Sequence, residues 1–263
     1  MLLQRFISAS IALPILVLMI WFGTGTTMAL IAAASVIGIR EFHRLAVRAG
    51  PTPVLFLATI GGVLFVVDAG TDFNFTMALI TGLVLAPLFL LLVLGPRERF
   101  LSDWAWTLAG VFYVAWTLSH AVHISRHADG REWLLTAALL TFAVDTGAYF
   151  VGRLIGRNHM APSISPGKTW EGAIAGLAVG IGASLAVTAG FDLPIGAWKA
   201  VVLGLLIGIF GQAGDLAESM IKRAAGVKDA GGLIPGHGGI LDRLDSLIPS
   251  VVVLYYFLTY GLG

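Results

Sequence analysis

The sequence predicts an all-α integral membrane protein that crosses the bilayer about nine times and has a cytoplasmic N-terminus. Of its 263 residues, 57% are hydrophobic and only 12% are charged, and the mean hydropathy is +0.90. These values are far more apolar than those of a soluble domain. Apolar runs of bilayer length recur along the chain, and the Lys and Arg residues gather in alternate loops. No repeat or soluble linker interrupts this pattern, so residues 1–263 are expected to form one membrane domain.

The individual spans follow from the apolar runs. The runs lie at 6–22, 26–39, 54–67, 76–95, 104–122, 133–152, 172–190, 197–217 and 247–262, and the second and third of them are short. A secretory signal peptide is the alternative for the first run, because Arg5 precedes it and small residues follow Trp21. Cleavage there would leave the other runs to orient the chain.

The positive charges separate sharply once the spans assign every loop to one side of the bilayer. Thirteen of the 16 Lys and Arg residues fall on the side that holds the N-terminus, namely Arg5, Arg40, Arg44, Arg48, Arg97, Arg99, Arg153, Arg157, Lys168, Lys222, Arg223, Lys228 and Arg243. Arg126, Arg131 and Lys199 fall on the other side. Because cytoplasmic loops are enriched in positive residues, the loops 153–171 and 218–246 are predicted to face the cytoplasm.

The rest of the composition narrows the function. The absence of cysteine excludes disulfides, cysteine nucleophiles and thiolate metal sites. The net charge of +1 gives no support to nucleic-acid binding. Polar motifs are concentrated in residues 126–263, so residues 1–125 are expected to serve mainly as scaffold. The glycines of the seventh and eighth spans are expected to let neighbouring helices approach closely.

Asp145 lies inside the sixth span, where an ionised carboxylate facing lipid would cost several kcal/mol. We therefore expect it to face a polar interior and to line a binding site. The alternative is a structural hydrogen bond between helices.

The segment SPGKTWEG, residues 165–172, combines hydroxyls, a Lys and a Glu directly before the seventh span. A helix N-terminus offers unpaired N–H groups to an anion, and Lys168 adds a full charge, so Ser165, Lys168 and Thr169 are candidate phosphate-binding residues. In the alternative interpretation Thr169 only caps the helix and Lys168 is a cytoplasmic anchor.

The eighth span ends in a polar face. Asp215, Ser219 and Lys222 are spaced to share one side of a helix and could join a metal ion to a phosphate. A solvated ion pair between Glu218 and Lys222 is the simpler alternative.

The following segment is rich in glycine and ends in two acids before the last span. Asp242 and Asp245 are three residues apart, and with Asp215 they could bind Mg²⁺ through carboxylate oxygens. Taken alone, two acids at this spacing are more often helix-capping residues. His237 is flanked by Pro and Gly, which is typical of a turn histidine but would also expose its ring.

These residues together resemble the signature of phosphatidate cytidylyltransferases, also called CDP-diacylglycerol synthases. The signature residues are Ser219, Lys222, Arg223, Lys228, Asp229, Pro235, Gly236, His237, Gly238, Gly239, Asp242, Arg243 and Asp245. SPGKTWEG is similar to a second block of that family, and the span layout is similar to that of its bacterial members.

The resemblance implies a reaction of CTP with phosphatidate at the cytoplasmic face of a bacterial inner membrane, giving CDP-diacylglycerol and pyrophosphate. It implies Mg²⁺ on Asp215 and Asp242, with Asp245 as a further ligand or support, and a second cation such as K⁺. It also implies that the residues acting on the substrates are Lys222, Arg223, Lys228, Asp229, His237 and Arg243, assisted by Ser165, Lys168, Thr169, Ser219 and Asp145. A homodimer is compatible with the family. Unlike Asp242, Asp103 lies outside the signature, so replacement of Asp103 by Asn is expected to leave the activity intact.

Two other functions compete with this one. A CDP-alcohol phosphotransferase would need an Asp-Gly-x-x-Ala-Arg pattern, and the nearest string, at 145–148, lacks the Arg. An ion-coupled transporter could use Asp145 and Asp215 as ion ligands, but it leaves the basic 219–246 segment unexplained and predicts an inverted repeat that the sequence does not display.

Overall fold

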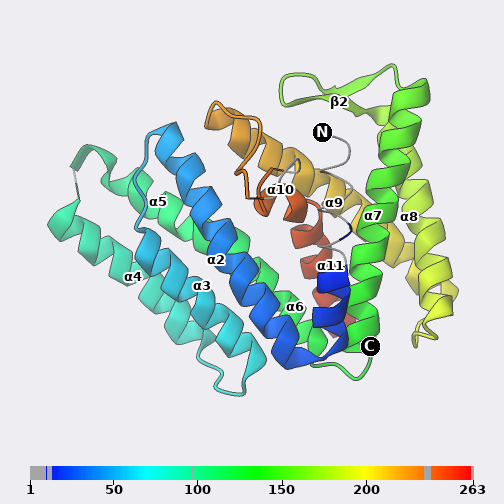
Figure 1. Ribbon diagram of the computed structural model, residues 1–263, viewed down its shortest axis with the longest axis horizontal. Helices are drawn as coiled ribbons and strands as arrows, with labels where there is room; N and C mark the ends of the chain where they lie inside the picture. The colour runs from blue at the N-terminus through cyan, green and yellow to red at the C-terminus, as the bar shows by residue number, and fades with distance from the viewer. Residues whose placement is uncertain (1–9, 11–13, 96, 234–237, 262–263) are drawn as a thin grey trace. The chain divides into compact units, whose positions relative to one another are not determined.

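The computed structural model describes residues 10, 14–95, 97–233 and 238–261, and these are almost entirely helical (Figure 1). The chain divides into two compact units. Unit 1 comprises residues 1–126 and 221–243, and unit 2 comprises residues 127–220 and 244–263. Each unit combines an earlier part of the chain with a segment near its C-terminus.

Among the residues that the structure describes, five helices are long and apolar enough to cross a bilayer. They are α4 (Thr76–Leu94), the continuous helical stretch Phe100–Ser125, α7 (Gly130–Ile155), α8 (Trp170–Gly190) and α9 (Ala197–Ala224). Two shorter apolar helices are α3 (Leu55–Gly70) and α11 (Leu247–Tyr260). The class of all-α, multi-pass membrane protein is thus confirmed, whereas the count of nine spans and the side of the N-terminus remain predictions.

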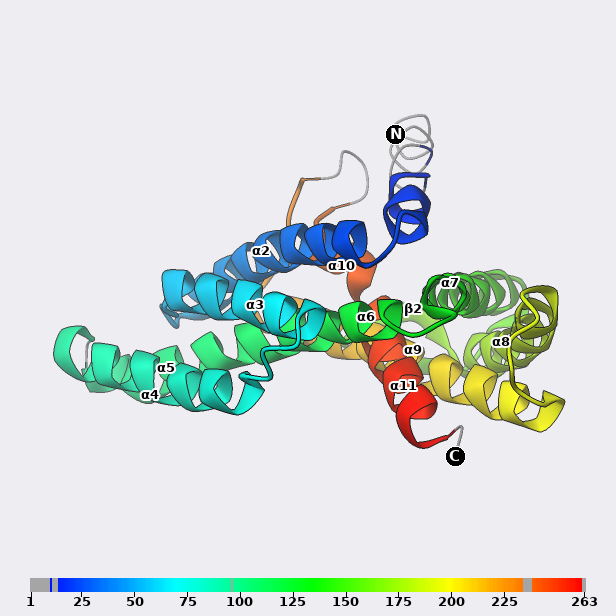
Figure 2. The ribbon, with the colours of Figure 1, turned by 90° about the horizontal axis from the view of Figure 1, so that it is seen from below.

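Unit 1 is built around α2 (Thr24–Ala49). This helix packs against α3, against the π-helical turn Val111–Trp116 and against α6 (Thr117–Ser125), and α3 packs in turn against α4. The two views show α2 and α3 running side by side (Figure 2). This unit also contains the helical residues 14–21, the 3₁₀ turn Arg97–Arg99 and α5 (Phe100–Gly110). The core of this unit is made by large apolar side chains such as Ile39, Phe42, Leu45, Phe65 and Leu118.

Buried carboxylates hold the loops of unit 1. Asp68, 6% exposed, accepts hydrogen bonds from the Phe75 N–H at 2.8 Å and from the Thr76 hydroxyl, and so caps the first turn of α4. Asp103 is fully buried and accepts from the backbone N–H and the hydroxyl of Thr52 at 2.6 and 3.0 Å. Asp103 is therefore a structural group that fixes the loop after α2. The sequence-based expectation concerned activity alone, namely that Asp103 tolerates replacement by Asn.

Unit 2 is organised by a long contact between α7 and α8. The chain that connects them forms an antiparallel hairpin of β1 (His159–Ala161) and β2 (Ser165–Thr169), so the candidate phosphate-binding segment is a strand that leads directly into α8. Thr169 accepts the N–H of Gly172 at 3.2 Å, as the capping interpretation predicts.

The expectation that glycines allow close helix packing in unit 2 is confirmed at most positions. Methyl groups added at Gly176 or Gly180 would clash with Val144 of α7, and one added at Gly204 would lie 2.8 Å from backbone atoms of α8. Gly214 of α9 is pressed against Pro249 at the start of α11. Gly182 differs, because nothing lies within 4 Å of its missing side chain.

Candidate active site

The first cluster of candidate residues centres on an ion pair in unit 1. The ammonium group of Lys222, in the last turn of α9, lies 2.7 Å from Asp242 Oδ1, in the short helix α10 (Leu241–Leu244). Asp242 Oδ2 accepts the backbone N–H groups of Ala230 and Gly239, each at 2.8 Å. Lys222 is 8% exposed and Asp242 6%. Two charges are tolerated out of water because both oxygens of the carboxylate have donors.

These contacts also set the protonation state of Asp242. Burial alone raises the pKa of its carboxyl, but the Lys222 ammonium and the N–H groups of Gly239 and Ala230 outweigh that effect and lower the pKa below its ordinary value. Asp242 is therefore an anion at neutral pH.

A testable consequence concerns acid stability. Because the pKa of Asp242 is lower in the folded than in the unfolded protein, the folded protein gains stability from this group at all pH values above the unfolded value of 3.8, and loses it as pH falls from there through the lower folded value. We expect the free energy of unfolding in detergent to fall with acidification more steeply in the wild type than in Asp242→Asn. Parallel pH curves for the two proteins would contradict this assignment.

The loop between α9 and α10 carries the other candidate residues of unit 1. Lys228, Asp229 and Arg243 are exposed, and Arg223 is exposed while it donates to the Val227 carbonyl at 3.2 Å. Gly238 has a φ of +81°, a left-handed conformation that favours glycine. His237, Pro235 and Gly236 lie outside the described residues. The segment that carries the buried ion pair therefore also carries three exposed cations, a composition suited to holding a polyphosphate.

Glu41 is the residue of this cluster that the sequence analysis missed. It belongs to α2, is 2% exposed, and accepts the N–H groups of Ile240 and Leu241 at 3.1 and 2.8 Å. The spacing of Gly38, Glu41 and Leu45 in the sequence could have indicated it, because this spacing puts Glu41 on the buried side of α2. A charged residue on that side needs a partner.

The second cluster lies in unit 2. Lys168 of β2 pairs with Asp215 Oδ2 of α9 at 2.8 Å and also donates to the Gln212 carbonyl at 3.3 Å. Ser219, one turn after Asp215, donates to Asp215 Oδ1 at 3.4 Å, so the predicted shared face of these two residues is present. Ser165, at the start of β2, is half-buried. One cation and one carboxylate from the two predicted motifs are therefore brought together.

The other polar groups of unit 2 surround the start of α11. Ser246 donates a long hydrogen bond of 3.5 Å to Asp145, and the Ser246 N–H donates to Asp245 at 2.7 Å. Asp145 is half-buried. Its carboxylate is therefore partly shielded by protein, which an acid inside a membrane span needs. Within the same unit, Gly214, next to Asp215, approaches the Asp245 carbonyl so closely that a methyl group would be 2.5 Å away.

The simpler alternative for Lys222, a solvated pair with Glu218, does not describe the structure. Glu218 is fully buried and Lys222 nearly so, and Lys222 binds Asp242. Neither side chain lies at the solvent surface.

The candidate metal ligands are three carboxylates, Asp215, Asp242 and Asp245. In the part of the chain that the structure describes, no three His, Asp or Glu side chains are gathered as a ready-made metal site. The candidate ligands Asp215, Asp242 and Asp245 are nevertheless all carboxylates, which is the hard oxygen chemistry that Mg²⁺ prefers, and a carboxylate keeps acceptor capacity beyond the bonds described above.

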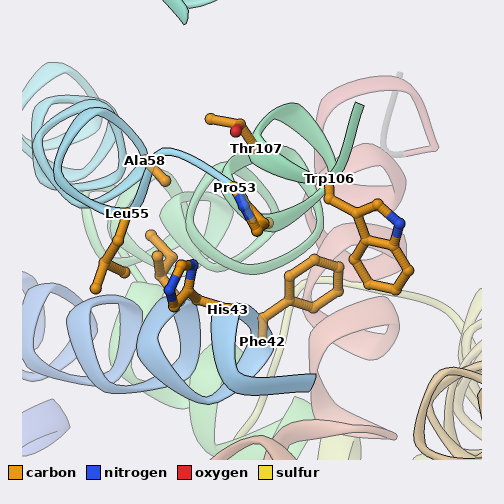
Figure 3. Close-up of a pocket in the computed structure, with 9 residues that line it drawn as sticks. Phe42, His43, Pro53, Leu55, Ala58, Trp106 and Thr107 are labelled. Atoms are coloured by element: carbon orange, nitrogen blue, oxygen red, sulfur yellow. The ribbon is translucent and has the colours of Figure 1, made fainter. Parts of the chain in front are cut away.

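A small cavity in unit 1 shares no lining residue with either cluster. It is lined by Phe42, His43, Pro53, Leu55 and Trp106 with their apolar neighbours (Figure 3). Burial lowers the pKa of His43, which keeps the ring neutral. With apolar walls and a neutral ring, the cavity has none of the charges that a phosphate ligand needs.

Comparison with known proteins places the chain among enzymes that act on nucleotides, and the basic residues of the two clusters are suited to binding phosphate groups. The chain belongs to the cytidylyltransferase family, whose match extends over residues 3–261. Among its relatives are proteins named phosphatidate cytidylyltransferase. The one from Brucella suis is 36% identical, with 96% of this chain and 92% of the relative covered. Those from Staphylococcus haemolyticus and Synechocystis are each 33% identical, with more than nine-tenths of both chains covered.

Proposed function

We propose that this protein is a phosphatidate cytidylyltransferase, which transfers the cytidylyl group of CTP to phosphatidate and releases pyrophosphate. The observation that carries the proposal is the match to the cytidylyltransferase family over residues 3–261, joined by named relatives that align along nearly their whole length. The product, CDP-diacylglycerol, is a precursor for phospholipid synthesis.

The reaction joins two anions, and this sets the demands on the site. A phosphate oxygen of phosphatidate attacks the α-phosphorus of CTP, a new P–O bond forms, and the bond to the departing pyrophosphate breaks. The protein has to offset the repulsion between the reactants and stabilise the charge on the leaving group. Phosphatidate is already anionic near neutral pH, so the reaction needs no general base.

We propose that the cations of the two clusters offset the repulsion between the reactants and stabilise the leaving pyrophosphate. Arg223, Lys228 and Arg243 are exposed cations of the first cluster and would contact the phosphates. Asp229 and His237 of the same loop are proposed to act beside them, His237 as a further phosphate contact and Asp229 as a group that orients the neighbouring cations. Lys222 would act there while it holds Asp242. In the second cluster Lys168 would bind a phosphate, supported by Ser165, Thr169, Ser219 and Asp145.

Mg²⁺ is proposed as the cofactor, with Asp215, Asp242 and Asp245 as the residues that would hold it and a monovalent cation such as K⁺ as its companion. When bound, the cation supplies positive charge against the phosphates. The carboxylates themselves contribute hard oxygen ligands, and Lys222 and Lys168 keep Asp242 and Asp215 oriented.

The membrane setting suits a lipid substrate. The acyl chains of phosphatidate can stay in the bilayer while its headgroup meets CTP at a polar site, which we propose to face the cytoplasm of a bacterial inner membrane. The thirteen cations on one side of the predicted topology support that orientation. A homodimer is also proposed from the family.

The test is direct transfer of label. Purified protein in detergent is incubated with phosphatidate, Mg²⁺ and CTP labelled in its α-phosphate, and the lipid phase is counted. Label that enters the lipid only with both phosphatidate and Mg²⁺ is the expected result. Folded protein that transfers no label would overturn the proposal, and loss of dependence on Mg²⁺ would overturn the cofactor alone.

Replacement of Lys168 by Met tests the second cluster. We expect the KM for CTP to rise about tenfold, because a charge-assisted hydrogen bond to phosphate is worth roughly 1.5 kcal/mol. The stability should change little, since the pair with Asp215 is partly exposed, with 23% and 31% of the two side chains accessible. Lys199→Met, at the start of α9, is the control and should leave the KM unchanged. An unaltered KM in Lys168→Met would restrict Lys168 to an anchoring role.

A further inference from the structure

Among the described residues, the buried carboxylate of Glu41 accepts hydrogen bonds from the segment 225–241, which connects α9 to α10. Its acceptor oxygens meet two consecutive backbone N–H groups, those of Ile240 and Leu241, at 3.1 and 2.8 Å. These are the N–H groups at the entry to α10, where a helix has no partners of its own for its first donors. The contact joins residues 199 and 200 positions apart in the sequence.

Two glycines of the same segment, Gly231 and Gly239, lie so close to this carboxylate that they leave no room for a side chain. A methyl group at Gly231 would lie 2.4 Å from Glu41 Oε1, and one at Gly239 would lie 2.5 Å from both carboxylate oxygens. No side chain could stand at either position without moving Glu41 or the loop. The backbone of the loop therefore approaches Glu41 as closely as a polypeptide allows.

Gly239 links Glu41 to the candidate ion pair. While its Cα faces Glu41, its N–H donates to Asp242 Oδ2 at 2.8 Å, and Asp242 in turn binds Lys222 at 2.7 Å. A shift of the loop away from Glu41 would therefore break a bond that orients Asp242. The burial of Glu41, at 2% exposure, leaves it no access to bulk solvent as an alternative partner.

We propose that Glu41 is a positioning residue for the cytidylyl-transfer site, one that fixes the entry to α10 so that Asp242 and Arg243 are presented to the triphosphate of CTP. The proposal rests on the proposed function and extends the site to a helix of the N-terminal half. Glu41 itself touches no substrate; it acts through the backbone of residues 239–241.

The primary test is Glu41→Gln, which keeps the size of the side chain but has one acceptor oxygen and an N–H₂ group that faces a backbone donor. In the labelled-CTP assay we expect kcat to fall at least tenfold, with the KM for CTP changed less than threefold. Asp68→Asn is the matched control, because Asp68 is also a buried carboxylate that caps a helix, but at α4. It should lose stability to a similar extent and keep the kcat of the wild type in its folded fraction.

A second variant approaches the same contact from the loop. Gly231→Ala places a methyl group against Glu41 Oε1 and should give the same fall in kcat with Glu41 intact, so it serves where Glu41→Gln fails to fold. Wild-type kcat in folded Glu41→Gln or in Gly231→Ala would overturn the positioning role, as would an equal fall in kcat in Asp68→Asn. An inactive wild type would instead overturn the proposed function, so the two failures are distinguishable.

Discussion

Replacement of Asp242 by Asn is expected to lower cytidylyl transfer by at least about 100-fold and the free energy of unfolding by about 3 kcal/mol. The stability loss follows from the contacts of the carboxylate. It is the partner of the nearly buried Lys222 and accepts two backbone N–H groups, and an amide can match only part of this set of donors. Removing one member of such a pair takes away a main counter-charge of the other buried group.

The activity loss follows from the proposed role of the same carboxylate as a ligand for Mg²⁺. Transfer of label from CTP to lipid measures it, and denaturation in detergent measures the stability. Asp72→Asn is the control, because Asp72 also forms an ion pair, with Arg126, but its side chain is 90% exposed. An exposed pair contributes little, so this variant should match the wild type in both measurements. Full turnover in folded Asp242→Asn would remove Asp242 from the metal site.

Replacement of Gly239 by Ala is expected to have the second-largest effect, a loss of transfer of at least about 30-fold with a stability loss of about 2 kcal/mol. The added methyl group would lie 2.5 Å from both oxygens of Glu41. Because Glu41 is held by its own bonds to residues 240 and 241, the loop has to move instead. That movement stretches the hydrogen bond from the Gly239 N–H to Asp242.

The same loop offers a matched control for this prediction. Gly232 has nothing within 4 Å of its missing side chain and no left-handed φ, so Gly232→Ala should retain wild-type transfer and stability. Both variants add one methyl group to the same glycine-rich segment, and only one of them meets Glu41. Equal activity of the two would show that the close approach at Gly239 is not needed.

Local pattern explains why parts of this structure could be predicted from the sequence. Apolar length predicts the long helices, and the hydroxyl before the run that begins at Trp170 predicts the cap at Thr169, since both depend on neighbouring residues alone. The glycines of α8 and α9 predict close packing because a small side chain permits it wherever the partner lies.

Contacts between distant segments were much harder to predict. The hairpin formed by 159–161 and 165–169 has a short, weak alternation that a loop shares. The pairs of Lys222 with Asp242 and of Lys168 with Asp215 were not predicted, because helical spacing describes only one helix at a time. Glu41 was missed for a related reason. Its hydrogen-bond donors are backbone N–H groups about 200 positions away, and every residue except proline has such a group, so the residue types do not reveal which ones Glu41 binds.

The bond between Glu41 and residues 240 and 241 also bears on the order of events during synthesis. Glu41 is made early, yet its partners emerge only when most of the chain has been translated. Until then the carboxylate has to remain hydrated or bound to something else, since burial without its donors is costly. Unit 1 is therefore completed only when its last segment, residues 221–243, has been synthesised. A chain truncated before residue 221 would lack Lys222, Asp242 and the backbone donors for Glu41.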